Sequence, residues 1–186
     1  MRKLFLFDCF GVIISEVSKL MDSYLNDEQK VYMRQSIYRK LDTGKISMEE
    51  MYAVLSNLSG MSVEQTKREW ANREQLFTDT IEVVKRLKAQ GHCIALLSNA
   101  AVDYIDYLFD KYGLNKYFDK VFVSAKYGCA KPDVEFYKLC LDGFDEQFER
   151  IYFTDDRADN LVGLESLGIT PVLFKGAEDF AKKVGA

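Results

Sequence analysis

The sequence predicts an α/β protein: a doubly wound parallel sheet with a small α-helical cap inserted after the first strand. Short apolar runs recur along the chain, and helical patterns separate most of them. Strands that alternate with helices pair in parallel through right-handed crossovers, and nearly continuous apolar strands are typical of a sheet covered on both faces. Residues 16–76 break this rhythm, because they contain several helical segments and no convincing strand. We therefore expect a core domain of residues 1–15 and 77–186 and a cap domain of residues 16–76.

Five apolar runs are the predicted strands, and their length and composition are those of buried strands. In chain order they are KLFLFD (3–8), HCIALLSN (92–99), KVFVSA (120–125), RIYFTDD (150–156) and TPVLF (170–174). The first run is unusual, because Asp8 places a charge inside the longer apolar stretch FLFDCFGVII. An unpaired carboxylate is strongly unfavourable in such surroundings. Its position therefore points to a function.

Four helices are predicted in the core from the spacing of apolar residues. Two of them close at Gly91 and Gly113, and glycine is favoured just beyond the last turn of a helix. A third is expected to begin at Pro132, because proline suits the first helical turn. A fourth is predicted over residues 161–167, where leucine recurs every third position before Gly168.

Two helix-start signals lie in the predicted cap. Ser47 with Glu50 and Ser62 with Gln65 have the spacing of a capping box, in which each side chain bonds the backbone N–H of the other residue. A helical insertion directly after the first strand is expected to cover the carboxyl end of that strand as a lid. The basic cap residues that are candidates to contact a substrate are Arg34, Arg39 and Lys45.

Composition argues against several classes of partner. The 25 basic and 29 acidic residues give a net charge of −4 without a basic stripe, so nucleic acid is not an expected partner. No apolar stretch approaches a membrane span, and the first run is cut by Asp8 and lacks a cleavage site, so we expect no membrane partner and a cytoplasmic location. The cysteines have neither metal-site nor disulfide spacing, and Cys9 is expected in the core.

Polar side chains follow four of the predicted strands, where ligands bind in open α/β sheets. In chain order they are Asp8, Ser98, Asn99, Lys131, Asp155 and Asp156. Carboxylates brought together repel one another unless a cation lies among them, and oxygen ligands suit Mg²⁺. The lysine, the hydroxyl and nearby loop amides would then hold an anion beside the metal. Each residue also has a structural alternative, such as a helix cap for Ser98 and Asn99 or a solvated loop lysine for Lys131.

In these motifs the chain resembles the haloacid dehalogenase (HAD) superfamily of hydrolases, and within it the phosphatase-like members with a small helical cap. Four segments carry the resemblance in the order of the family: FDCFGVI, LLSNA, AKPD and FTDDRADN. Each segment alone occurs by chance in many proteins. All four in order, each at the end of a predicted strand, are a specific signal that covers the whole chain.

The resemblance implies a role for each rim residue. Asp8 would be the nucleophile and form an aspartyl-phosphate, and Lys131 would neutralise charge on the phosphate and the nucleophile. The expected phosphate-binding residues are Phe10, Gly11, Ser98, Asn99 and Lys131. The expected Mg²⁺ ligands are Asp8, the backbone carbonyl of Phe10, Asp156 and Asp155, with Asp155 either binding the metal directly or supporting its ligands. Asn160 would orient the groups around the metal.

Phe10 departs from the family pattern and leaves three functions open. Most phosphatases of the superfamily carry D-x-D here, and the second aspartate protonates the leaving oxygen, which Phe10 cannot do. An aromatic residue at this position resembles the metal-independent 2-haloacid dehalogenases, but those lack the acidic pair Asp155 and Asp156. We therefore favour a Mg²⁺-dependent phosphatase of a small phosphorylated metabolite, with a sugar phosphate among the candidates. A degenerate phosphate- or metabolite-binding protein is the third alternative.

The same departure gives a prediction. General acid catalysis is worth about 10²- to 10⁴-fold in rate. Phe10→Asp is therefore expected to raise the rate on poor leaving groups by about 10-fold or more, and an unchanged rate would mean that another group already serves as the acid.

Overall fold

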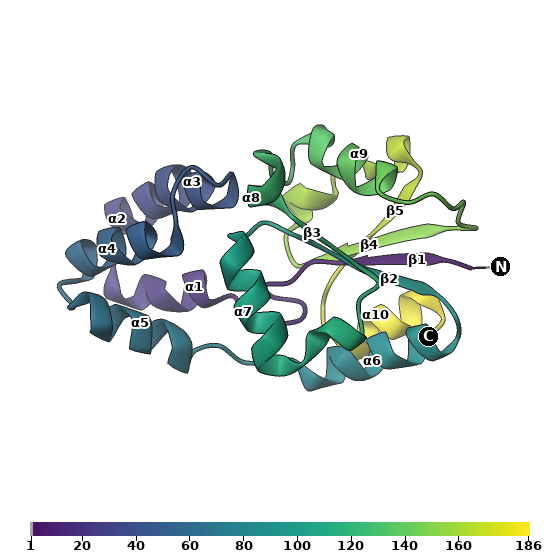
Figure 1. Ribbon diagram of the computed structural model, residues 1–186, viewed down its shortest axis with the longest axis horizontal. Coiled ribbons are helices and arrows are strands. Elements are labelled where there is room, and N and C mark those ends of the chain that lie inside the picture. Colours follow the sequence, from purple (N-terminus) through teal and green to yellow (C-terminus); the bar gives the residue numbers. More distant parts are fainter. Residues whose placement is uncertain (1) are drawn as a thin grey trace.

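A five-stranded parallel sheet forms the centre of the computed structural model, which describes residues 2–186 (Figure 1). The strands are β1 (Leu4–Phe7), β2 (Cys93–Ser98), β3 (Lys120–Val123), β4 (Ile151–Asp155) and β5 (Ile169–Leu173). Their order is β3-β2-β1-β4-β5, and every pairing is parallel. The chain winds in opposite directions on the two sides of β1, so the crevice beyond the carboxyl end of β1 is the expected ligand site. The predicted doubly wound fold is confirmed.

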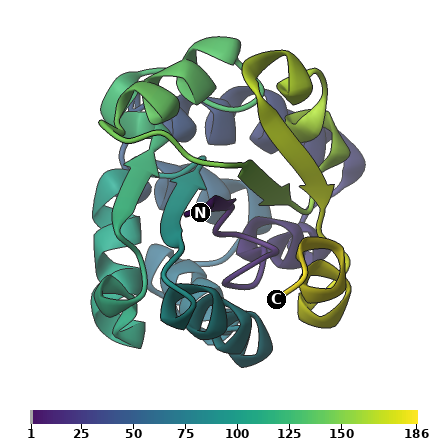
Figure 2. The same cartoon turned by 90° about the vertical axis from the view of Figure 1, so that its right-hand side faces the viewer.

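Helices cover both faces of the sheet (Figure 2). Side chains alternate along β1, so that Phe5 and Phe7 join one buried cluster and Leu4 and Leu6 join the other. The first cluster is covered by α6 (Thr78–Ala89), α7 (Val102–Tyr112) and α10 (Ala177–Val184). The second is covered by α9 (Val134–Asp142) together with short turns before β5. Burial on both faces explains why the strands read as nearly continuous apolar runs.

Two helix predictions in the core are corrected. Residues 161–167 do not form an α-helix: two 3-10 helices, η4 (Ala158–Leu161) and η5 (Leu164–Leu167), are separated by an extended Val162 and by Gly163 at φ 76°. A recurrence every third residue is the repeat of the 3-10 helix, and the sequence carried that period. The predicted start at Pro132 is also wrong, since α9 begins at Val134 after an extended residue 133.

Helices of the cap lie beyond the carboxyl ends of the strands (Figure 1). They are α1 (Val17–Met21), η1 (Asp22–Tyr24), α2 (Asp27–Tyr32), the π-helical η2 (Met33–Tyr38), α3 (Arg39–Asp42), α4 (Met48–Ser59) and α5 (Val63–Asn72). Both predicted capping boxes are confirmed, at the starts of α4 and α5. We propose the predicted boundaries, 16–76 for the cap and 1–15 with 77–186 for the core, as the domain division.

Two chain segments connect the cap to the core, and they are hydrogen-bonded to each other. The Ser15 N–H donates to the Gln75 carbonyl at 2.9 Å, and the Phe77 N–H donates to the Ile13 carbonyl at 2.9 Å. The buried Ser15 hydroxyl donates to the Arg73 carbonyl at 2.6 Å and accepts from the Gln75 N–H at 2.9 Å. The cap is thus joined to the core through one paired junction next to β1.

Among residues 2–186, no helix has both the length and the apolar character that crossing a bilayer requires.

Candidate active site

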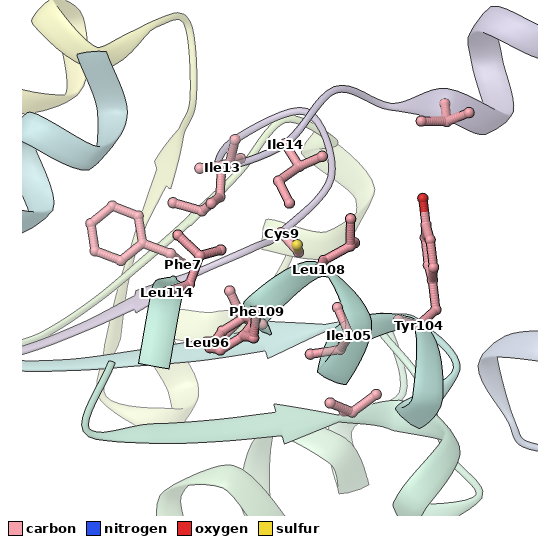
Figure 3. Packing of buried hydrophobic residues seen from close by; sticks show 14 of the residues in the cluster. Phe7, Cys9, Ile13, Ile14, Leu96, Tyr104, Ile105, Leu108, Phe109 and Leu114 are labelled. Atoms are coloured by element: carbon pink, nitrogen blue, oxygen red, sulfur yellow. The ribbon is translucent and has the colours of Figure 1, made fainter. Parts of the chain in front are cut away.

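Asp8 lies directly after β1, at the carboxyl edge of the sheet, which faces the cap. Its N–H donates to the Thr154 carbonyl at 2.9 Å, which fixes its backbone to the end of β4. The Cys9 N–H donates to Asp8 Oδ1 at 2.7 Å. The Cys9 side chain itself is fully buried and lies among the apolar side chains of Ile14 and Leu108 (Figure 3). The prediction that Cys9 belongs to the core is confirmed.

Lys131 is the cation of the site. Its Nζ donates to Asp8 Oδ1 at 2.7 Å and to Asp155 Oδ2 at 2.8 Å, and the residue is only 3% exposed. Asn99 fixes its backbone in both directions: the Lys131 N–H donates to Asn99 Oδ1 at 2.8 Å, and Asn99 Nδ2 donates to the Lys131 carbonyl at 2.9 Å. The structure thus rules out the alternative of a solvated loop lysine. It brings Asp8, Asn99 and Lys131 together.

Asp155 is fully buried and holds its neighbours in place. Its Oδ1 accepts from the Arg157 N–H at 2.8 Å, and its Oδ2 accepts from Lys131 and from Asn160 Nδ2 at 2.9 Å. Asn160 is fixed in turn, because its carbonyl accepts from the Tyr137 hydroxyl at 2.6 Å. Both oxygens of Asp155 are therefore occupied. Of the two roles predicted for Asp155, this favours the supporting one.

Asp156 differs from Asp155, because one of its oxygens has no partner. Asp156 Oδ2 accepts from Lys19 of the cap at 2.9 Å, whereas Oδ1 is buried without a hydrogen bond among residues 2–186. Asp8, Asp155 and Asp156 each offer a carboxylate oxygen, and these oxygens lie within 4.8 Å of one another. A set of carboxylate oxygens with one left unpaired fits a hard divalent cation such as Mg²⁺.

Gly11 approaches Asp156 so closely that no side chain fits between them. A Cβ on Gly11 would lie 2.7 Å from both Cγ and Oδ2 of Asp156, and the backbone has φ 80°, which favours glycine. The Gly11 N–H donates to the Ile14 carbonyl at 2.6 Å. The phosphate contact expected of Gly11 stays a prediction, and the structure gives this residue a second role in placing Asp156.

The electrostatics of the site reflect two buried carboxylates that share one lysine. Burial raises the pKa of Asp8 to about 8; Lys131 opposes this shift, and the charge of Asp155 adds to it. Burial alone would lower the pKa of Lys131, but the two carboxylates hold it above its ordinary value. The positive charge of Lys131 therefore does not fully offset the effect of burial on the Asp8 carboxylate. A further cation beside it would favour the ionised, nucleophilic form.

Ser98 and Phe10 complete the predicted set. Ser98 is fully buried at the end of β2, and its hydroxyl has no hydrogen-bond partner among the described residues. The ring of Phe10 stacks on Tyr104, with centroids 5.8 Å apart and planes 12° apart. The Tyr104 hydroxyl accepts from Trp70 Nε1 at 2.7 Å and donates to Glu74 Oε1 at 2.9 Å. Phe10 is thus held in an aromatic cluster that links cap and core.

A cavity of about 600 Å³ lies between the core residues of the site and the cap. The core contributes Asp8, Phe10, Asn99, Ala100, Ala101, Tyr104, Lys131, Pro132, Arg157 and Asn160. The cap contributes Glu16, Val17, Ser18, Lys19, Arg34, Tyr38, Arg39, Leu41, Asp42, Met48 and Trp70. Of the basic cap residues considered from the sequence, Arg34 and Arg39 line the cavity and Lys45 does not. Sequence reasoning missed Glu16, Tyr38 and Asp42. For Tyr38 and Asp42 the available signal was their helical spacing from Arg34.

The site combines a carboxylate at the end of the first strand, a lysine and an acidic pair beside it, and a helical cap above them. These features define a hydrolase of the α/β class with its chemistry at the strand ends. The chain belongs to the haloacid dehalogenase-like hydrolases, since the family model matches residues 2–168. The resemblance stated from the sequence is thereby confirmed.

Known proteins similar to this chain include phosphatases. A sesquiterpene phosphatase of Aspergillus oryzae is 23% identical over 171 residues, which cover 90% of this chain and 87% of that protein. D-ribitol-5-phosphate phosphatase of Bacteroides thetaiotaomicron is 25% identical over 178 residues, covering 87% of this chain and 86% of that one.

Solved structures share the fold. A HAD family enzyme from Bacteroides thetaiotaomicron has a TM-score of 0.78 at 22% identity and covers 98% of both chains. A structure of this enzyme with magnesium and inorganic phosphate has a TM-score of 0.76 at 22% identity, covering 98% of this chain and 99% of that one. The L-2-haloacid dehalogenase of Xanthobacter autotrophicus is more distant, with a TM-score of 0.63 at 16% identity, and it covers all of this chain and 84% of its own.

Proposed function

We propose that this protein is a Mg²⁺-dependent phosphatase that hydrolyses a small phosphorylated metabolite through an aspartyl-phosphate on Asp8. The observation that carries the proposal is the arrangement around Asp8. Its Oδ1 accepts a hydrogen bond from Lys131 at 2.7 Å, and an oxygen of Asp156 and one of Asp155 lie within 4.8 Å of a carboxylate oxygen of Asp8. A nucleophile held beside a lysine and a carboxylate set suits transfer of a phosphoryl group.

Each residue of the site has a defined task in that reaction. Asp8 attacks phosphorus with the oxygen that Lys131 and Cys9 leave free, since both of them bond Oδ1. Lys131 stays charged and neutralises the phosphoryl oxygens, and the Asn99 side chain fixes the position of the Lys131 backbone. The unpaired Ser98 hydroxyl donates to a phosphoryl oxygen.

The metal would be held by Asp8, Asp156 and the backbone carbonyl of Phe10. When bound, Mg²⁺ supplies positive charge to the phosphoryl oxygens and keeps Asp8 ionised. Asp155 supports this arrangement by fixing Lys131 and Asn160. The buried, unpaired Asp156 Oδ1 and the raised pKa of Asp8 support the assignment of a cation to this place.

The cavity supports a small organic substrate. Its volume of about 600 Å³ is that of a small-molecule site, and its walls combine aromatic rings with charged groups. The related phosphatases act on substrates as different as a sesquiterpene and ribitol 5-phosphate, judged by their names. A small phosphate ester, a sugar phosphate among the candidates, is the substrate class that fits.

A second candidate is supported by Phe10. Its ring takes the place where metal-independent 2-haloacid dehalogenases of the superfamily carry an aromatic residue, and displacement of halide needs no leaving-group acid. Asp155 and Asp156 count against this reaction, because a dehalogenase has no use for an acidic set that attracts a cation. Dehalogenation is therefore kept as an alternative outcome of the test.

The test measures turnover of an aryl phosphate and of acetyl phosphate with Mg²⁺ and with EDTA. We expect activity that EDTA abolishes and that Asp8→Asn lowers by at least about 10⁴-fold, as loss of a nucleophile does. The matched control is Asp159→Asn, an exposed acid of η4, which should retain activity. Activity indifferent to EDTA would contradict the metal role, and chloride release from 2-chloropropionate without metal would favour the dehalogenase. Phosphate binding without turnover would favour a binding protein.

A further inference from the structure

The cap wall of the cavity carries a row of polar groups that the proposed reaction has not used. Arg34, Tyr38 and Asp42 are spaced four residues apart along the continuous helical stretch of η2 and α3, and all three line the cavity. Side chains at this spacing share one face of a helix. The Tyr38 hydroxyl is buried without a partner, and the Asp42 carboxylate has no hydrogen bond or ion pair among residues 2–186. Arg34 is ion-paired with Asp22, so Tyr38 and Asp42 are the two groups of this face that are free to act on a bound molecule.

The reaction still needs a proton donor. Expulsion of an alkoxide requires protonation of the leaving oxygen, and Phe10 has no group that can supply it. The carboxyl groups that line the cavity are Asp8, Glu16 and Asp42. Asp8 is the nucleophile. The choice therefore lies between Glu16 and Asp42.

Glu16 is the weaker candidate, because one of its carboxylate oxygens is already engaged. Burial raises its pKa too, but the Ser18 hydroxyl donates to Glu16 Oε1, and this hydrogen bond and the charge of Lys19 oppose the shift. The tyrosines of the cavity are weaker still, since burial and nearby acids hold the pKa of Tyr38 and of Tyr104 well above the usual value.

Asp42 has surroundings that suit an acid. Burial raises its pKa to about 7, and the negative charge of Glu16 adds to that shift. Lys131 opposes the shift, followed by Arg39 and Arg157. A general acid works best when its pKa lies near the operating pH. Asp42 also lines the same cavity as the nucleophile Asp8 and Lys131, whose Nζ is 2.7 Å from Asp8 Oδ1.

We propose that Asp42 is the general acid and base of this enzyme, supplied by the cap in place of the acid that Phe10 cannot provide. The proposal rests on the phosphatase function proposed above. In the first step Asp8 bonds to phosphorus, the bond from phosphorus to the leaving oxygen breaks, and the Asp42 carboxylic acid gives its proton to that oxygen. In the second step water attacks phosphorus, Asp42 takes one proton of the water, and Asp8 leaves as a carboxylate with release of inorganic phosphate.

The test compares wild type with Asp42→Asn on two phosphate esters in rapid-mixing experiments with Mg²⁺. With 2,4-dinitrophenyl phosphate, which needs no acid, the variant should release one dinitrophenolate per site at nearly the wild-type rate and then stall. With an alkyl phosphate, the first step should slow by about 10²- to 10⁴-fold, with no burst. Equal slowing of the first step on both esters, or no slowing on either, would overturn the proposal.

Two further measurements separate this role from a structural one. The wild-type rate on the alkyl phosphate should fall as pH rises through about 7, because Asp42 then loses its proton, and this limb should vanish in Asp42→Asn. Phe10→Asp should restore the alkyl phosphate rate of Asp42→Asn by about 10-fold or more, and failure of both would contradict the proposal. Asp27→Asn, an exposed cap acid, is the control. Wild-type turnover of dinitrophenyl phosphate that needs Mg²⁺ and Asp8 tests the phosphatase function separately.

Discussion

Compared with the cap wall of the cavity, the core wall holds its charged side chains in a closed set of hydrogen bonds. Lys131 lies between Asp8 and Asp155, and Asp155 in turn accepts from Asn160 and from the Arg157 backbone. On the cap wall, Asp42 and the Tyr38 hydroxyl have no hydrogen bond within the described part of the chain. Groups fixed before the reaction lower its barrier, whereas unpaired groups are available to a substrate.

The two walls also differ in how they depend on one residue. The core wall depends on Lys131, because its removal leaves two buried carboxylates facing each other. On the cap wall, Arg39 pairs with a single carboxylate, that of Asp133, and both side chains are partly exposed. A closed network is also the more sensitive of the two to a single substitution, since removing one partner of a buried ion pair leaves a buried charge uncompensated. Single substitutions in each wall therefore test this difference.

The largest effect is expected for Lys131→Met. Near pH 8 the free energy of unfolding should fall by about 3–5 kcal/mol, the cost of removing one partner of a buried ion pair, and phosphatase activity should be lost. Urea denaturation followed by circular dichroism measures the change. Lys126→Met, at an exposed position of α8 (Ser124–Tyr127), is the matched control and should stay within about 0.5 kcal/mol. A loss below about 1 kcal/mol for Lys131→Met would show that the core wall is not held by this cation.

Most of the core wall could be predicted from the sequence because strand ends converge at one edge of a parallel sheet. Asp8, Lys131 and the acidic pair each follow an apolar run, so the fold class alone brings them together. The division of work between Asp155 and Asp156 could not be predicted. It depends on which side chain points to Lys131 and which remains partly unpaired.

The cap wall was less predictable for a physical reason. A helix presents one face to the cavity, but that face is set by packing against neighbouring helices, and a single sequence does not fix the rotation. Arg34 and Arg39 were considered from the sequence because they are basic, while Tyr38 and Asp42 were overlooked although they lie on the same stretch. The prediction of one α-helix over residues 161–167 was wrong for a different, local reason: Val162 and Gly163 leave the helical region of the backbone.

A smaller effect is expected for Gly11→Ala, which tests how the core wall places Asp156. The new Cβ would lie 2.7 Å from the Asp156 carboxyl group at φ 80°, so the free energy of unfolding should fall by about 1–3 kcal/mol. The stabilisation that added Mg²⁺ gives to wild type should also shrink, because Asp156 must move. Thermal unfolding with and without Mg²⁺ measures both effects.

Gly163 provides the control for Gly11. It has φ 76° with no atom within 4 Å of a built Cβ, so Gly163→Ala carries the backbone strain without the contact to Asp156. Both variants should lose stability, and only Gly11→Ala should lose the response to Mg²⁺. An equal response in the two variants would show that the position of Asp156 does not control binding of the metal.

The smallest effect is expected for Tyr104→Phe, which tests the contact between the two walls. The Tyr104 hydroxyl of α7 accepts from Trp70 Nε1 of the cap helix α5, so the substitution leaves a buried N–H without a partner, at a cost of about 1–2 kcal/mol. Trp70 is the single tryptophan, so its fluorescence reports the cap while circular dichroism reports the whole chain. In Tyr104→Phe the fluorescence transition in urea should move to a lower concentration than the circular dichroism transition.

The matched control for Tyr104 is its neighbour Tyr107. Tyr107 is 46% exposed and its hydroxyl donates to Glu74 only at 3.4 Å, so Tyr107→Phe should change stability by less than about 0.5 kcal/mol. If the two transitions of Tyr104→Phe coincide at a lowered midpoint, cap and core unfold as one unit even without this hydrogen bond. The paired junction through Ser15 and Gln75, with the ion pairs Lys19–Asp156 and Arg39–Asp133, would then be enough to couple the cap to the core.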